Sequence, residues 1–114
     1  MKISDKRFAS AEQFMSGYFN QDWRPTLKAA HRPQTVDGAI AFAIEQYPIE
    51  ALRRVVISFK QILQENPTEE ELYDFFVKQG GLGYDPTYAG GTIREFTQYI
   101  LDALQRSPKL STKS

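Results

Sequence analysis

The chain has 114 residues, of which 41% are hydrophobic and 13% aromatic, a composition that supports one folded domain with a single core. Basic and acidic residues balance at 14 each, so the chain lacks the basic excess with which a general nucleic-acid binder meets phosphates. It contains no cysteine, which excludes disulfides, thiolate nucleophiles and cysteine-ligated metal sites.

The first predicted helix covers about Ala11–Phe19, where apolar side chains recur at helical spacing. Ser10 and Gln13 stand three residues apart and predict a capping box at its start. Pro25 lacks a backbone N–H and disfavours a helical residue before it, so this helix cannot continue through that position. A short turn of helix over Thr26–His31 is one interpretation of the segment that follows.

Two further helices are predicted on either side of Pro48. Thr35 suits the N-cap of the first, which runs to Tyr47, and Pro48 suits the first position of the second. In the second helix apolar residues recur every three or four positions to about Leu63. The β-branched run Val55–Ile57 would also suit a strand, but the periodicity on both sides favours a helix.

The last two helices begin at two more capping boxes, Thr68 with Glu71 and Thr92 with Glu95. The pair Gly80–Gly81 ends the first of these helices, and a loop rich in glycine and proline leads to the second. The pattern as a whole predicts an all-α, single compact domain of about five main helices with short loops over residues 1–106. Residues 107–114 are polar and basic, and we expect a flexible C-terminal tail there.

The chain offers little for catalysis. His31 is the only histidine, and a surface or capping role is the simplest interpretation of a lone histidine. The glycines at 80, 81 and 83 follow a helix rather than a strand, and no Gly-Lys-Ser/Thr follows them, so they predict a turn and not a phosphate-binding loop. We expect no enzymatic activity, no cofactor and no metal; a small enzyme that uses carboxylates alone is a remote alternative.

Two features of the sequence bear on where in the cell the protein is expected. No segment approaches the ~20 apolar residues that cross a bilayer, and the first residues lack the apolar core of a secretory signal. We therefore expect a cytoplasmic protein that contacts neither a membrane nor nucleic acid directly.

Acidic side chains concentrate between residues 65 and 85. Glu70 and Asp74 are four residues apart, so a helix places them on one face. A solvated helix face is the simpler interpretation of such a cluster. The functional interpretation is a surface kept acidic to receive a basic partner.

Two segments carry a family resemblance. The first is Gly17–Trp23, with the letters GYFNQDW, at the end of the first helix; the second is LGYDP at 82–86, followed by GTIREF into the last helix. In this order and spacing, over about residues 12–105, the chain resembles the small helical immunity proteins of bacterial contact-dependent growth inhibition (CDI) systems.

The resemblance implies a stoichiometric inhibitor that binds the C-terminal domain of its cognate toxin, frequently a nuclease, as a 1:1 heterodimer. A nuclease presents a basic substrate cleft, which an acidic surface can enter as a phosphate mimic. The candidate toxin-binding residues are therefore Glu65, Glu69, Glu70, Glu71 and Asp74.

The shared motifs are expected to hold the fold, because an immunity protein must diverge where it contacts its own toxin. Gln21 and Asp22 are expected to cap or bridge helix ends, and Trp23 and Tyr84 to pack over the core. The full set expected to be structural is Tyr18, Phe19, Gln21, Asp22, Trp23, Gly83, Tyr84, Asp85 and Pro86. The main alternative is a helical adaptor or regulatory protein-binding domain unrelated to toxins; a helix-turn-helix DNA binder is disfavoured, since no recognition helix is basic.

Overall fold

The computed structural model describes residues 8–79, 82–83 and 91–111, and within these residues all regular structure is helical. The expected all-α class is confirmed, but the described residues form seven α-helices rather than about five, together with one π-helical segment. The elements are α1 (Ala9–Tyr18), α2 (Trp23–Ala29), α3 (Val36–Gln46), α4 (Ile49–Gln64), α5 (Glu69–Tyr73), the π-helix η2 (Asp74–Gln79), α6 (Ile93–Arg106) and α7 (Pro108–Ser111).

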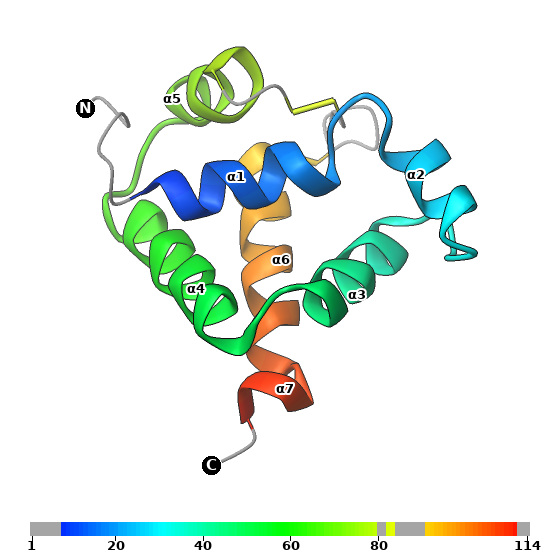
Figure 1. The fold of residues 1–114 in the computed structure, drawn as a ribbon. Helices are drawn as coiled ribbons and strands as arrows, with labels where there is room; N and C mark the ends of the chain where they lie inside the picture. Colours follow the sequence, from blue (N-terminus) through cyan, green and yellow to red (C-terminus); the bar gives the residue numbers. More distant parts are fainter. Residues whose placement is uncertain (1–7, 80–81, 84–90, 112–114) are drawn as a thin grey trace.

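The core lies where α1, α4 and α6 turn their apolar faces inward. The helix α4 packs on both α1 and α6, and α3 closes the side of the bundle against α1 and α6 (Figure 1). Apolar side chains three and four residues apart supply these faces, as the helical period requires. Phe14 of α1 meets Phe59 of α4 edge to face, with ring centroids 5.9 Å apart. The fully buried aromatic side chains of the described core are Phe8, Phe14, Phe19, Phe59 and Phe76.

The predicted threonine caps are confirmed. The side chain of Thr35 accepts a hydrogen bond from the backbone of α3, and Thr68 and Thr92 each form a complete capping box. In the box at α5, Thr68 N–H donates to Glu71 Oε1 at 2.8 Å and Glu71 N–H donates to Thr68 Oγ1 at 3.1 Å. These local signals lie within three residues of one another, so the sequence alone reveals them.

The capping box predicted at Ser10 and Gln13 is wrong. The N-cap of α1 is Phe8, which makes no side-chain capping bond. Instead, the N–H of Ala11 donates to the buried Ser58 Oγ of α4, at 3.2 Å. A side chain 47 residues away therefore satisfies one of the free amides in the first turn of α1.

The short helix α2 begins at Trp23, earlier than the predicted turn, and contains Pro25 at its third position. Proline is tolerated there because the first amides of a helix have no intrahelical partner in any case. Pro48 likewise differs by one position from the prediction, because it is the N-cap of α4 and Ile49 is the first helical residue.

Part of the expected C-terminal tail has regular structure. Residues 108–111 form α7, in which Leu110 is half-buried against the core and Ser107, just before it, is buried. Residues 112–114 lie outside the described residues. Among the helices that are described, none combines the length and apolar character needed to cross a bilayer.

Candidate functional site

The five candidate toxin-binding carboxylates lie around the start of α5 and the beginning of η2, and the structure divides them into two groups. Glu69 belongs to the first group, because both its oxygens accept hydrogen bonds from another helix. Oε1 accepts from the backbone N–H of Ile93, and Oε2 accepts from that of Arg94 at 3.3 Å. Arg94 in turn donates from Nη2 to the carbonyl of Pro67, just before α5. Glu69 thus joins the first turns of α5 and α6, and a carboxylate at a helix N-terminus also meets the positive end of the helix dipole.

Glu71 is also engaged within the fold. Its capping-box bond from the Thr68 backbone is the main reason why the pKa of its carboxyl lies below the ordinary value of 4.5. Its charged form is therefore favoured in the folded protein, and this carboxylate acts first as a cap for α5.

Glu65, Glu70 and Asp74 form the second group. Glu65 and Glu70 are exposed, and Asp74 is half-buried. Asp74 Oδ1 lies 3.4 Å from Lys78 Nζ, one turn along, so this carboxylate has a basic partner within its own element. Tyr73, the last residue of α5, is 42% exposed and lies between Glu70 and Asp74 in the sequence. The acidic surface available to a binding partner is therefore smaller than the five acidic residues of the sequence suggest.

The two segments that carry the resemblance contact each other. The N–H of Gly83 donates to the carbonyl of Phe19 at 2.7 Å. A Cβ on Gly83 would lie 2.2 Å from the backbone nitrogen of Gln21 and 2.5 Å from the carbonyl carbon of Asn20, so only glycine fits this close approach. The residues expected to carry the second segment further, Tyr84, Asp85 and Pro86, lie outside the described residues.

The first segment is buried at its aromatic residues and exposed at its polar ones. Trp23 is only 7% exposed and packs on Phe19, with ring centroids 5.6 Å apart. Gln21 and Asp22 are exposed. The expected capping role of the Asp22 side chain is wrong: Asp22 is the N-cap of α2 but makes no side-chain capping bond, while Asn20 Oδ1 accepts the Asp22 N–H at 2.8 Å.

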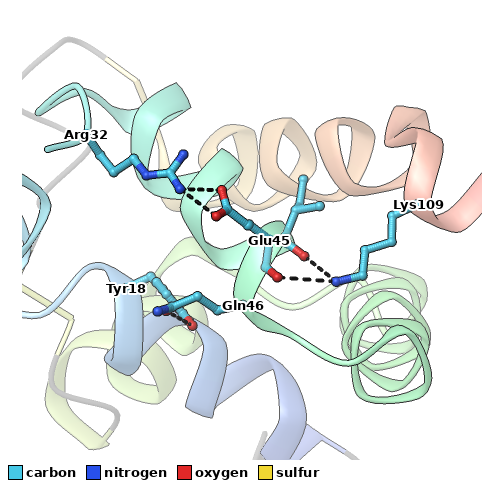
Figure 2. Close-up of polar contacts among 6 residues, drawn as sticks. Tyr18, Arg32, Glu45, Gln46 and Lys109 are labelled. Atoms are coloured by element: carbon cyan, nitrogen blue, oxygen red, sulfur yellow. Dashed lines mark hydrogen bonds and ion pairs between the residues drawn. The ribbon is translucent and has the colours of Figure 1, made fainter. Parts of the chain in front are cut away.

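A cleft of about 270 Å³ opens between α1, α2 and α3, lined by Tyr18, Trp23, Phe42, Gln46 and Tyr47 among others. The hydroxyl of Tyr18 donates to Gln46 Oε1 at 2.9 Å (Figure 2). Burial, and secondarily the neighbouring Tyr47, raises the pKa of Tyr18, and burial raises the pKa of Tyr47, so both phenols stay protonated near neutral pH. The sequence pointed to Tyr18 and Trp23, but it missed Phe42, which lies off the predicted apolar face of α3.

Beside this cleft, α3 is held at its C-terminal end by side chains from outside it. Arg32 pairs with Glu45 at 2.5 Å, and its guanidinium lies 5.6 Å from the ring centroid of Phe42. Lys109 of α7 donates from Nζ to the carbonyls of Ile44, at 2.8 Å, and Glu45, at 3.5 Å (Figure 2). It also donates to the carbonyl of Tyr47. The C-terminal end of a helix carries a partial negative charge and free carbonyls. A cation that binds these carbonyls therefore stabilises the end of α3.

Among the residues that the structure describes, the titratable groups do not gather as a catalytic site would require. His31 is exposed, in the turn after α2, with a φ of 59°. In the part of the chain that the structure describes, no three histidine or carboxylate side chains gather closely enough to hold a metal ion. What the described surface offers is a set of faces and clefts suited to contact with another molecule.

Comparison with known proteins agrees with a binding role. A chain of the crystal structure of the CdiA-CT/CdiI complex from Y. kristensenii 33638 superposes with a TM-score of 0.74 over 87% of this chain and 99% of that chain. Its sequence identity is 15%, so this likeness establishes a shared fold. No curated protein matches the sequence. Residues 7–104 match the family described as CdiI immunity protein. Because that match covers most of the sequence, the resemblance is confirmed and the chain belongs to the CdiI immunity protein family.

Proposed function

We propose that this protein neutralises the C-terminal domain of a cognate CDI toxin by binding it as a 1:1 complex in the cytoplasm of the cell that produces both. The family match over residues 7–104 is the observation that carries the proposal. The fold shared with a chain of a CdiA-CT/CdiI complex supports it. Inhibition by stoichiometric binding requires no catalytic group in the inhibitor, so the protein need not be an enzyme.

We further propose that the toxin is a nuclease and that the acidic surface formed by Glu65, Glu70 and Asp74 meets its basic substrate cleft. Glu65 and Glu70 are exposed and Asp74 is half-buried, and carboxylates at a surface present a negative potential that steers a basic surface into contact. Tyr73 adds an exposed ring of the kind that anchors protein interfaces. Glu69 and Glu71 contribute to this potential, but their hydrogen bonds to the backbone tie them to the fold.

The motif residues are proposed to hold the fold rather than to select the toxin. The burial of Phe19 and Trp23 and the close approach of Gly83 to Gln21 support this role. Residues that a whole family shares for folding leave the remaining surface free to diverge with each toxin.

The test is co-expression with the C-terminal domain encoded by the adjacent upstream gene. We expect the two proteins to co-purify at equal molar amounts, and the activity of the isolated toxin on RNA and DNA to fall to background at one equivalent of this protein. An upstream product whose activity is unchanged by a molar excess of this protein would contradict the proposal. The alternative, a helical adaptor unrelated to toxins, would then be favoured.

A further inference from the structure

One face of α4 is exposed in the part of the chain that the structure describes. Val55 is buried and Val56 is half-buried, but Ile57, which completes this β-branched run, is 54% exposed. It is the most exposed of the large hydrophobic side chains that the structure describes. A β-branched residue is a weaker helix former than leucine or alanine, and an exposed one gains little from burial. Neither helix formation nor core packing therefore explains an isoleucine at this position.

Three cations surround Ile57 on the helix surface. Arg53 and Arg54 precede it by one turn, and Lys60 follows it by one turn, so all three lie beside it on the outer side of α4. All three are exposed, and within the described residues none of them forms an ion pair. The only carboxylate on α4 is Glu50, near its start, so the face around Ile57 is basic.

A groove runs from Ile57 toward the C-terminal end of the fold. It has a volume of about 350 Å³ and is lined by Arg53, Val56, Ile57, Gln105 and Leu110. The helix α7, which supplies Leu110, packs against both α4 and α6. The groove thus has apolar walls and a basic rim, and its volume lies in the range of pockets that accept a ligand group.

We propose that this basic-rimmed groove on α4 is a second docking surface for the toxin, and that it accepts a toxin segment in which an apolar side chain is flanked by carboxylates. Charge complementarity selects this occupant, because Arg53 lines the groove and Arg54 and Lys60 lie one turn from Ile57, and none of the three forms an ion pair within the described residues. Cations beside an apolar groove favour carboxylates around an apolar side chain. The proposal rests on the proposed function and names a contact apart from the acidic surface on α5.

A second copy of this chain is a poorer occupant. Its acidic element is α5 with η2, where Glu69 and Glu71 already bind backbone amides and Asp74 already pairs with Lys78. The exposed Glu65 and Glu70 of such a copy belong to the acidic surface assigned above to the toxin, so self-association through them would compete with toxin binding.

The experiment measures binding of the full chain to the toxin C-terminal domain from the upstream gene. We expect Ile57→Asp to raise the Kd by about tenfold or more, the effect typical of a central interface residue. The double variant Arg53→Glu/Arg54→Glu should raise the Kd by at least as much and make binding less sensitive to added salt. Two controls add negative charge elsewhere: Ala41→Asp on the exposed side of α3 matches Ile57→Asp, and Lys28→Glu reverses one exposed cation on α2. Each is expected to leave the Kd within about twofold.

A second readout does not depend on affinity. Because the chain has no cysteine, Ile57→Cys introduces a single thiol whose alkylation rate reports its exposure. We expect toxin to slow alkylation at this position and to leave the thiol of the control variant Ala41→Cys unaffected. Unchanged melting temperatures would verify that each variant is folded.

The outcomes separate the two proposals. If the wild-type protein does not bind the toxin, the proposed function fails and this inference fails with it. If the wild-type protein binds but Ile57→Asp binds equally well and toxin does not protect the Ile57→Cys thiol, only the inference on α4 is overturned. Self-association of the free protein that Ile57→Asp abolishes would assign the groove to a second copy and also overturn it.

Discussion

The backbone N–H of Gly83 donates a 2.7 Å hydrogen bond to the carbonyl of Phe19, and this bond joins two segments that are 64 residues apart. Phe19 ends α1 and is fully buried against Trp23 and Phe96. The bond therefore ties the chain after η2 to the corner between α1 and α2.

Gly83→Ala should destabilise the protein by about 1–3 kcal/mol, the usual cost of forcing extra atoms into a packed site. The new Cβ would lie 2.2–2.5 Å from backbone atoms of Asn20 and Gln21, which cannot move as a flexible side chain would. The free energy of unfolding, measured by urea denaturation, checks this prediction.

Gly17→Ala is the matched control. It makes the same chemical change at an exposed position of α1, where a Cβ meets nothing within 4 Å. Alanine is the better helix former by about 1 kcal/mol, so this variant should be as stable as the wild type or more stable. Equal effects at the two positions would contradict the packing argument.

The hydrogen bonds between the Glu69 carboxylate and the first turn of α6 lead to a second stability prediction. Glu69→Ala removes the acceptor for the N–H groups of Ile93 and Arg94 and should cost about 1–2 kcal/mol, as the loss of a helix cap does. The exposed neighbour Glu70 provides the control, since Glu70→Ala should change the free energy of unfolding by less than about 0.5 kcal/mol. If the two variants are equally stable, Glu69 does not hold α5 and α6 together.

Local patterns predicted the helices well because the sequence places their signals side by side. The caps at Thr35, Thr68 and Thr92 are examples, each confirmed with its partner three residues away. Contacts between distant segments were not predictable in this way. The cap of α1 comes from Ser58 in another helix, so the local pair that looked like a capping box was misleading.

The same limit applied to the candidate site. In the sequence, the five acidic residues were equivalent candidates for toxin binding. In the structure, Glu69 and Glu71 bind backbone amides and Asp74 pairs with Lys78. Only the fold distinguishes these carboxylates from the more exposed Glu65 and Glu70. By contrast, the exposed isoleucine on α4 has a local signal, because Arg53, Ile57 and Lys60 follow helical spacing on the polar face.

The lowered pKa of Glu71 predicts a loss of stability in acid. Its folded-state pKa lies below the unfolded value, so its contribution is fully present above the unfolded pKa and is lost as the pH falls through the folded pKa. Glu71→Gln has no such titration, so its stability should fall less steeply than that of the wild type as the pH drops below about 4.5. Urea midpoints across this range, with Glu70→Gln as the control, measure the difference; parallel curves for Glu71→Gln and the wild type would exclude this role.

Trp23→Ala should lower the melting temperature strongly, because replacing a buried tryptophan by alanine costs about 3–5 kcal/mol. At a temperature where the variant remains folded, its affinity for the toxin should be close to that of the wild type. An unchanged melting temperature together with lost toxin binding would make Trp23 a contact residue rather than part of the core.

The acidic surface on α5 is tested by reversing its exposed charges. The double variant Glu70→Lys/Asp74→Lys should weaken toxin binding by about tenfold or more and slow association, because it replaces attraction to a basic cleft by repulsion. Its affinity should also depend less on salt than that of the wild type, since fewer favourable charge contacts remain to be screened. Asp22→Lys, an exposed reversal at the start of α2, is the matched control and should bind like the wild type. Equal affinities and equal salt dependences for all three proteins would show that α5 is not part of the interface. A loss of affinity in the double variant alone would show that Glu70 and Asp74 contact the toxin. Glu69 and Glu71 would then serve the fold.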